Sequence, residues 1–308
     1  MADWTASDIP PQTDRVAVVT GTGGLGYEDA LALARAGAEV IVAGRNPAKG
    51  ANAVARIEAA VPGAKIRFEP LDLASLPSIA AFADRFTKRY TRLDLLINNA
   101  GVMVPPQRQQ TEDGFELQLG INYLGHFALT GQLLPFLRST SGSRVVTLSS
   151  VAARSGKIDF DDINAIARYR RMPVYSQSKL ACLMFSLELQ RRSESGQWGL
   201  ASLGAHPGIA RTELLHNAPG RRSAVGLTRS LLWFLFQPVA QGALPTLFAA
   251  TAREAVPGAY YGPRSFGETR GAPAMARIPP QALDEEAARQ LWEVSQIMTG
   301  VTFGSPSH

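Results

Sequence analysis

Short apolar runs rich in β-branched residues alternate along most of the chain with longer segments of helical periodicity. The runs that predict strands span residues 16–20, 39–43, 65–69, 93–98, 144–148 and 200–204. The segments that predict helices span residues 28–36, 47–60, 78–90, 116–137 and 174–192. Because right-handed crossover helices cover the faces of a parallel sheet, this alternation predicts an α/β fold: a doubly wound parallel sheet with helices on both faces.

Past residue 210 the alternation weakens. An apolar helical pattern over residues 228–250, broken near Pro238, predicts two further helices. Residues 258–261 predict a last strand, and residues 282–299 predict a closing amphipathic helix.

No linker rich in proline, glycine or serine is long enough to divide the chain. Residues 1–308 are therefore interpreted as a single domain, with residues 1–14 as an N-terminal extension. Within it, residues 211–280 are expected to form a small segment that builds a substrate pocket at one end of the sheet.

A glycine-rich turn directly follows the first predicted strand and opens the first helix. It reads Gly21, Thr22, Gly23, Gly24, Leu25, Gly26. Glycine at these spacings permits a tight turn, lets backbone N–H groups approach a pyrophosphate, and lets the helix pack closely on the strand. In this context the turn predicts a Rossmann-type dinucleotide site, although a glycine-rich turn without a ligand would read the same way.

The residue type after the second strand separates NADP from NAD. An NAD site places an acidic residue there, ~20 residues beyond the glycines, to bind the ribose 2′-hydroxyl. This chain has Arg45 instead, and no acidic residue lies between Glu39 and Glu58. A guanidinium suits a 2′-phosphate, so NADP(H) is favoured over NAD(H) as the cofactor.

Tyr175 and Lys179 lie one turn apart on one face of a predicted helix. A phenol is a weak base, but an adjacent ammonium favours its phenolate form. On its own such a pair is more often part of a solvated helix face, so its meaning depends on the motifs around it.

Three further motifs follow predicted strands in a characteristic order. They are residues 98–101 (Asn-Asn-Ala-Gly), Ser149 with Ser150, and residues 206–212 (His-Pro-Gly-Ile-Ala-Arg-Thr). Together with Tyr175 and Lys179 they resemble the short-chain dehydrogenase/reductase family. Residues 122–126 (Asn-Tyr-Leu-Gly-His) and 291–295 (Leu-Trp-Glu-Val-Ser) resemble its branch of retinol dehydrogenases and protochlorophyllide reductases.

The resemblance implies four catalytic residues. Tyr175 would be the general acid/base, and Lys179 would hold the nicotinamide ribose and favour the phenolate. Ser150 would hydrogen-bond the substrate oxygen, and Asn122 would steady a water that connects Lys179 to solvent. Ser149 is the other candidate at the strand end, and the family pattern selects Ser150.

The resemblance also implies cofactor contacts beyond the glycine turn, Arg45, Tyr175 and Lys179. Contacts to the adenine and its ribose would come from Asp72, Leu73, Asn99, Ala100 and Gly101. Contacts to the nicotinamide end would come from Pro207, Gly208, Ile209 and Thr212. The glycine turn is one residue shorter than the usual family pattern, which predicts altered loop geometry and weaker cofactor affinity.

Composition and charge exclude several classes of protein. The net charge is +5, from 31 Lys and Arg against 26 Asp and Glu, but the basic residues are scattered, so nucleic acid is not expected as a partner. The four histidines lack metal-ligand spacing, and no metal site is expected. Cys182, the one cysteine, and an N-terminus without an apolar signal region favour a reduced, cytoplasmic location, and no apolar run is long enough for a transmembrane helix.

The expected partner is a small-molecule substrate, medium-sized and apolar, with a carbonyl or alcohol group. Candidates for its pocket, or alternatively for ordinary core packing, are Met103, Leu214, Leu215, Trp233, Phe234 and Phe236. The resemblance makes a homodimer through the helices at residues 116–137 and 174–192 possible, although monomers also occur in this branch.

These features predict an NADP(H)-dependent oxidoreductase that transfers hydride between nicotinamide and a carbonyl or alcohol. Two alternatives stay open. The same scaffold could reduce a C=C bond of an enone, or it could be a dinucleotide-binding regulator that does not catalyse, which only the short glycine turn favours.

Overall fold

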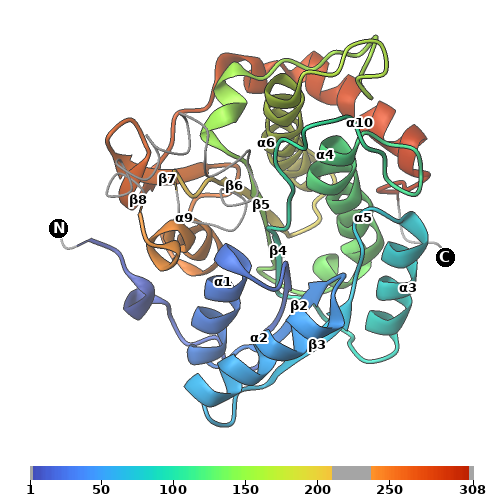
Figure 1. The fold of residues 1–308 in the computed structure, drawn as a ribbon. Coiled ribbons are helices and arrows are strands. Elements are labelled where there is room, and N and C mark those ends of the chain that lie inside the picture. The colour runs from blue at the N-terminus through green and yellow to red at the C-terminus, as the bar shows by residue number, and fades with distance from the viewer. Residues whose placement is uncertain (1–2, 210–236, 305–308) are drawn as a thin grey trace.

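A computed structural model describes residues 3–209 and 237–304. Within these ranges eight strands form one sheet in the order β3-β2-β1-β4-β5-β6-β7-β8 (Figure 1). They are β1 (Val16–Thr20), β2 (Glu39–Gly44), β3 (Ile66–Pro70), β4 (Leu95–Asn98), β5 (Arg144–Leu148), β6 (Ala201–Ala205), β7 (Tyr260–Ser265) and β8 (Arg270–Met275). All neighbours are parallel except β7 and β8, which pair antiparallel, so the predicted doubly wound α/β sheet is confirmed.

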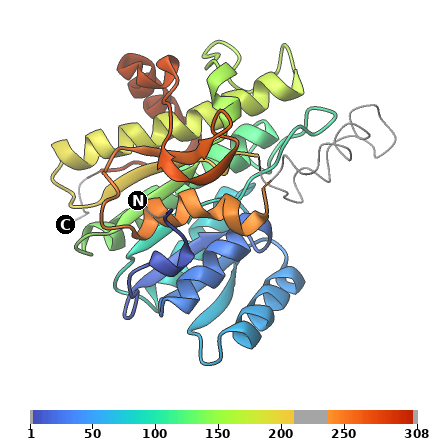
Figure 2. The same ribbon diagram turned by 90° about the vertical axis from the view of Figure 1, so that its left-hand side faces the viewer.

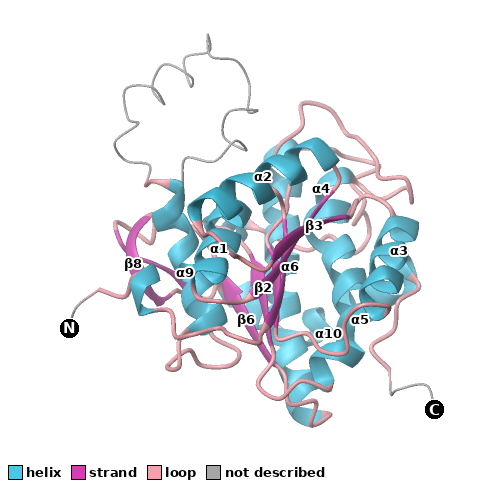
Figure 3. Ribbon diagram, turned by 90° about the horizontal axis from the view of Figure 1, so that it is seen from below, coloured by secondary structure: helices cyan, strands magenta, loops and turns pink. Residues whose placement is uncertain are grey.

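Helices cover both faces of the sheet (Figures 1 and 3). One face packs against α1 (Gly24–Arg35), α2 (Pro47–Ala60) and α9 (Val239–Thr251). The other packs against α3 (Leu76–Thr87), α5 (Gly125–Arg138), α6 (Arg171–Ser195) and α10 (Glu285–Thr299). Shorter helices are α4 (Leu117–Leu119), the 3-10 helices η1 (Ala6–Asp8), η3 (Val151–Ser155) and η5 (Pro280–Leu283), and the π-helix η2 (Gly120–Leu124).

The alternation of side chains along β1 feeds two separate cores. Ala17 and Val19 pack on the α1 side, whereas Val16 and Val18 pack on the α6 side. Because successive residues of a strand point to opposite faces, a strand buried on both faces is apolar throughout. The near-continuous apolar runs of the sequence follow from this burial.

The strand order reverses between β1 and β4, the third and fourth strands of the sheet. In open parallel sheets such a reversal leaves a crevice outside the carboxyl ends of the strands, where ligands bind. Thr20 ends β1 and Asn98 ends β4, so the motifs that follow them lie at this crevice.

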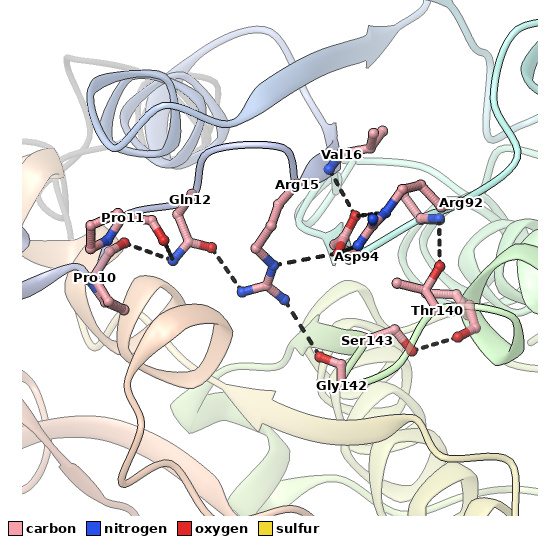
Figure 4. Close-up of polar contacts among 12 residues, drawn as sticks. Pro10, Pro11, Gln12, Arg15, Val16, Arg92, Asp94, Thr140, Gly142 and Ser143 are labelled. Atoms are coloured by element: carbon pink, nitrogen blue, oxygen red, sulfur yellow. Dashed lines mark hydrogen bonds and ion pairs between the residues drawn. The ribbon is translucent and has the colours of Figure 1, made fainter.

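The opposite, amino end of the sheet is closed by a network of polar contacts around Asp94. Its buried carboxylate accepts a hydrogen bond from the Val16 N–H at 2.9 Å and pairs with Arg92 at 2.6 Å and Arg15 at 3.6 Å (Figure 4). Arg15 also donates to Gln12 at 2.9 Å. These contacts join β1 to β4 at their amino ends and do not involve their carboxyl ends.

Several element ends are shifted by a few residues from the sequence prediction, and three differences bear on the site and the sheet. Helix α1 begins at Gly24, directly within the glycine turn. The helix predicted over residues 116–137 contains the π-helix η2. Gly125 directly follows η2, and a Cβ built on Gly125 would lie 2.5 Å from the carbonyl oxygen of Leu73. Strand β8 was not predicted, because its residues, Arg-Gly-Ala-Pro-Ala-Met, have neither apolar alternation nor β-branched side chains.

The C-terminal segment packs onto α5 and α6. The ring of Trp292 lies 5.1 Å from that of Phe127 and 5.7 Å from that of Phe185. Gly131 of α5 approaches Val301 so closely that a Cβ there would lie 2.5 Å from it. These contacts occupy part of the surface on which the predicted pairing of two subunits depends, and a dimer stays a prediction.

None of the helices in residues 3–209 and 237–304 is both long enough and apolar enough to span a membrane.

Asp29 is fully buried in α1, and neither of its carboxyl oxygens has a hydrogen-bond partner. Burial, and secondarily the charge of Glu28, raises the pKa of Asp29 well above its usual value. A carboxyl group whose pKa is higher in the folded protein costs stability as the pH rises above the pKa of the unfolded chain.

We therefore expect Asp29→Asn to increase the free energy of unfolding by about 1–3 kcal/mol at about pH 8 and by less at about pH 5. Urea unfolding at both pH values measures the difference. Asp84→Asn, on the exposed surface of α3, is the control and should change stability little. An Asp29→Asn gain that does not grow with pH would contradict this explanation.

Candidate active site

A hollow with a volume of ≈ 500 Å³ lies at the carboxyl ends of the strands. Its walls come from the glycine turn, the ends of β4 and β5, helix α6 and the turn after β6. Predicted site residues in the wall are Gly21, Gly23, Gly24, Leu25, Arg45, Asn99, Ala100, Gly101, Ser150, Tyr175, Lys179, Pro207, Gly208 and Ile209. A second hollow of ≈ 260 Å³ adjoins it and adds Thr22, Asp72 and Leu73.

The glycine turn has a shape that only glycine allows at two positions. Gly21 has a φ of 103°, and a Cβ there would lie 2.8 Å from Nδ2 of Asn99. A Cβ on Gly26 would lie 2.6 Å from the Gly21 carbonyl oxygen, so Gly26 is packed inside the turn and does not face the cavity. Helix α1 starts at Gly24 without a side-chain cap, which leaves backbone N–H groups to a ligand. This cradle fits the pyrophosphate of a dinucleotide.

Thr20 and Asn99 connect β1 to β4 beside the glycine turn. The Thr20 hydroxyl oxygen accepts hydrogen bonds from the N–H groups of Asn99 at 2.9 Å and Ala100 at 3.0 Å. The Asn99 amide donates to the Thr20 carbonyl at 2.7 Å. The side-chain amide of Asn99 therefore stabilises the start of the glycine turn.

His126 completes this junction; the sequence analysis named it in the motif of residues 122–126 and as a histidine without metal-ligand spacing, but assigned it no role. Burial lowers the pKa of His126 to about 4, so the ring is neutral. Its Nδ1–H donates to the Asn122 carbonyl at 3.0 Å, since that oxygen can only accept, and its Nε2 accepts from the Thr20 hydroxyl at 2.9 Å. Spacing alone gives no signal for such a contact between distant residues.

Tyr175, Lys179 and Ser150 meet in the wall of the larger cavity. Tyr175 and Lys179 project from one side of α6, and the Lys179 ammonium donates to the Leu148 carbonyl at 3.0 Å. Ser150 follows β5, and its hydroxyl accepts from the Ala152 N–H at 3.2 Å. Within the described residues its own proton has no acceptor, so it can donate to a ligand.

Ser149 has a different environment. Its hydroxyl donates to the Lys179 carbonyl at 2.7 Å, so its proton is used inside the protein. Of the two serines, Ser150 has the hydroxyl available for a substrate oxygen.

Asn122 lies behind the cavity wall, not in it. Its amide oxygen accepts from the Val102 N–H at 2.7 Å, and its amide nitrogen donates to the Val102 carbonyl at 3.0 Å and to Ser178 at 2.9 Å. Its own carbonyl accepts from His126 and, at 3.1 Å, from the Cys182 thiol. The side chain thus fixes the segment that follows Gly101, and the predicted water contact stays a proposal.

Arg45 lines both hollows, and Lys49 joins it in the smaller one. The sequence analysis did not single out Lys49, although it falls in the first turn of the helix that follows Arg45. Asp72 and Leu73 face the same hollow, where the Asp72 carboxylate accepts from the Ala74 N–H at 2.9 Å. Two basic side chains at this end favour an anionic group.

The remaining wall near Tyr175 is mainly apolar. It is formed by Met103, which was predicted, and by Val102, Val151, Ala152 and Met172, which were not. Several other predictions lie outside the described residues: Thr212 for the cofactor and Leu214, Leu215, Trp233, Phe234 and Phe236 for the substrate.

Comparison with known proteins agrees with this geometry. The family model described as short chain dehydrogenase matches residues 15–222. The chain is 40% identical to mouse polyprenol dehydrogenase, covering 98% of this chain and 89% of the relative, and 40% identical to human retinol dehydrogenase 13, covering 95% and 86%.

Solved structures show the same fold. An uncharacterized protein from Mycobacterium paratuberculosis superposes with a TM-score of 0.82 at 37% identity, covering 99% of this chain and all of that one. A Shigella flexneri short chain dehydrogenase complexed with NADP has a TM-score of 0.65 at 25% identity, covering 82% of this chain and 98% of that one. The chain therefore belongs to the short-chain dehydrogenase/reductase family, in its retinol dehydrogenase-like branch.

Proposed function

We propose that the protein is an NADP(H)-dependent oxidoreductase that acts on a carbonyl or alcohol of a medium-sized apolar substrate. The observation that carries the proposal is the meeting of Tyr175, Lys179 and Ser150 in one cavity wall. The glycine cradle and Arg45 lie in the same cavity, so one dinucleotide could contact both groups of residues.

The bound nicotinamide would supply or accept the hydride. Tyr175 would give its phenolic proton to the carbonyl oxygen in reduction and would remove the hydroxyl proton in oxidation. The Lys179 ammonium would favour the phenolate and bind the adjacent ribose. The free proton of Ser150 would form a hydrogen bond to the substrate oxygen and stabilise negative charge on it.

The substrate class follows from the apolar wall beside these residues. Met103, Met172, Val151 and Ala152 would contact the carbon skeleton of a substrate. The relatives named retinol dehydrogenase and polyprenol dehydrogenase carry the names of apolar alcohols, which supports the same class for this chain.

The choice of NADP(H) rests on Arg45 and Lys49 at the far end of the site. Both would neutralise a 2′-phosphate, and no carboxylate from the end of β2 is present to bind a free 2′-hydroxyl. The structurally similar Shigella flexneri protein in complex with NADP supports the same choice.

We expect Tyr175→Phe to lower kcat by about 10²- to 10⁴-fold and to leave the Kd for NADPH nearly unchanged, because only the transferable proton is removed. Steady-state kinetics and fluorescence titration with NADPH measure the two effects. The control is Tyr90→Phe, since Tyr90 hydrogen-bonds Glu39 near the amino end of the sheet. Turnover retained in Tyr175→Phe would exclude the role of Tyr175.

Arg45→Asp should weaken NADPH binding by about 10- to 100-fold and NADH binding far less, because a charged hydrogen bond to the 2′-phosphate is lost. Arg35→Asp, an exposed charge reversal at the end of α1, is the matched control. Equal weakening of both cofactors by Arg45→Asp would disprove the 2′-phosphate contact.

Ser150→Ala and Ser149→Ala should separate the two serines. Loss of the Ser150 hydroxyl should lower kcat by about 10²-fold, because one hydrogen bond to the reacting oxygen is removed. Loss of the Ser149 hydroxyl should instead lower the free energy of unfolding by about 1 kcal/mol, with kcat nearly unchanged. The reverse pattern in kinetics and urea unfolding would assign the substrate contact to Ser149.

A further inference from the structure

A group of charged and polar side chains around the buried His206 lies behind the turn formed by residues 207–209, and the proposed function does not use it. His206 follows β6 and is fully buried. Its Nε2 lies 3.0 Å from the carboxylate of Glu268, and its Nδ1 accepts from the Gly208 N–H at 3.2 Å. Glu268 belongs to the turn between β7 and β8, in the hairpin at the edge of the sheet (Figure 2).

These two hydrogen bonds determine the protonation state of the ring. The Gly208 amide can only donate, so Nδ1 of His206 carries no proton, and Nε2–H donates to Glu268. Burial lowers the pKa of His206, which keeps the ring neutral. A second proton on Nδ1 would face the Gly208 N–H and break that contact.

The ring has little freedom to move. It packs 5.1 Å from the ring of Tyr260. The ring also lies against Gly262: a Cβ built there would lie 2.0 Å from Nε2 of His206, so only glycine leaves room for the ring. The imidazole is thus fixed between β7 and the turn after β6.

Glu268 is itself held from two directions. Arg154 of η3 pairs with its carboxylate at 2.6 Å, and the Arg277 N–H donates to it at 3.0 Å. Burial alone would raise the pKa of Glu268, but the hydrogen bonds from His206 and Arg277 and the charge of Arg154 outweigh it and lower the pKa to about 2. Glu268 also has a φ of 67°, an uncommon conformation for a residue other than glycine.

The same hairpin holds the turn after β6 through its backbone. The Ile209 N–H donates to the Thr269 carbonyl at 2.9 Å. Gly208 has a φ of 62°, and a Cβ there would lie 2.3 Å from that same carbonyl oxygen. The shape of the turn at residues 207–209 therefore depends on where the hairpin lies.

Pro207, Gly208 and Ile209 line the larger cavity, whereas neither His206 nor Glu268 does. Arg154 lies in the helix that directly follows Ser150. The cluster thus connects three segments behind the cavity: the helix after Ser150, the turn after β6, and the β7–β8 hairpin. The region matched by the family model ends at residue 222, so Glu268 lies beyond it.

We propose that Glu268 is a positioning residue: through the buried imidazole of His206 it holds the turn of residues 207–209 in the shape that accepts the nicotinamide end of the dinucleotide. This inference rests on the proposed function. It predicts that losing the Glu268–His206 contact weakens binding at the nicotinamide end and leaves the adenosine end unchanged.

Two probes separate the ends of the site. NADPH spans the whole dinucleotide site, whereas adenosine 2′,5′-bisphosphate lacks the nicotinamide half. We expect Glu268→Leu to raise the Kd for NADPH about tenfold and to change the Kd for the bisphosphate less than twofold. The control is Glu285→Gln, which removes an exposed ion pair with Arg289 in α10 and should change neither Kd.

A pair of substitutions at His206 tests the path of the effect. His206→Asn keeps an oxygen that can accept from the Gly208 N–H but loses the Nε2–H that donates to Glu268, so it should weaken NADPH binding as Glu268→Leu does. His206→Leu also lacks the acceptor and should behave in the same way. Equal losses of NADPH and bisphosphate affinity in Glu268→Leu would indicate a general loss of structure and overturn the inference.

The ring state can be measured without any cofactor. Long-range ¹H–¹⁵N spectra resolve the imidazoles of the four histidines, and His206→Asn assigns the His206 signal. We expect a neutral ring with its proton on Nε2 at neutral pH; a proton on Nδ1, or a charged ring, would overturn the inference.

The titrations also separate this inference from the proposed function. Wild-type protein that binds neither probe would overturn both together. Wild-type binding of both probes, with an unchanged NADPH Kd in Glu268→Leu, would overturn this inference alone.

Discussion

The hydroxyl group of Thr20 joins β1 to the backbone after β4, at the point where the strand order reverses. It accepts hydrogen bonds from the backbone after β4 and contacts the neutral ring of His126, which in turn holds the Asn122 carbonyl. The glycine turn, the wall at Gly101 and the π-helix are therefore fixed by one group of neighbouring contacts. The proposed cofactor contacts at the glycine turn and at residues 99–101 depend on this junction.

Polar groups at the amino ends of the strands stabilise the fold, whereas those at the carboxyl ends are available to bind a ligand. At the amino end, the carboxylate of Asp94 forms ion pairs with Arg15 and Arg92. At the carboxyl edge the start of α1 lacks a side-chain cap, and the Ser150 proton has no acceptor among the described residues. Hydrogen-bonding capacity is thus concentrated where a ligand would bind.

Sequence reasoning succeeded where structure depends on local periodicity. The strands at residues 16–20 and 144–148 were predicted with the bounds that the structure has, because both strands are buried and apolar. It also identified residues that the fold brings to one cavity, since parallel strands end at a common edge. Strand β8 escaped prediction because it gains its extended form from pairing with β7, not from its own side chains.

The contacts that sequence reasoning missed join residues far apart in the chain. Thr20 to His126 and His206 to Glu268 leave no spacing signal, because their geometry arises only when the sheet is assembled. Asn122 was placed at the site by resemblance, yet its amide groups hold Val102 and Ser178 behind the wall. A residue type indicates what chemistry is possible, and packing decides whether its atoms are free.

Strand β8 forms one edge of the sheet, and Pro273 lies within it opposite Pro263 of β7. Proline has no N–H group to donate to a neighbouring strand, and the pairing of β7 with β8 is irregular between Pro263 and Ser265. An edge of this kind is a poor template for a strand from a second molecule. The hairpin that shapes the proposed nicotinamide end thereby also protects this edge of the sheet from pairing with another molecule.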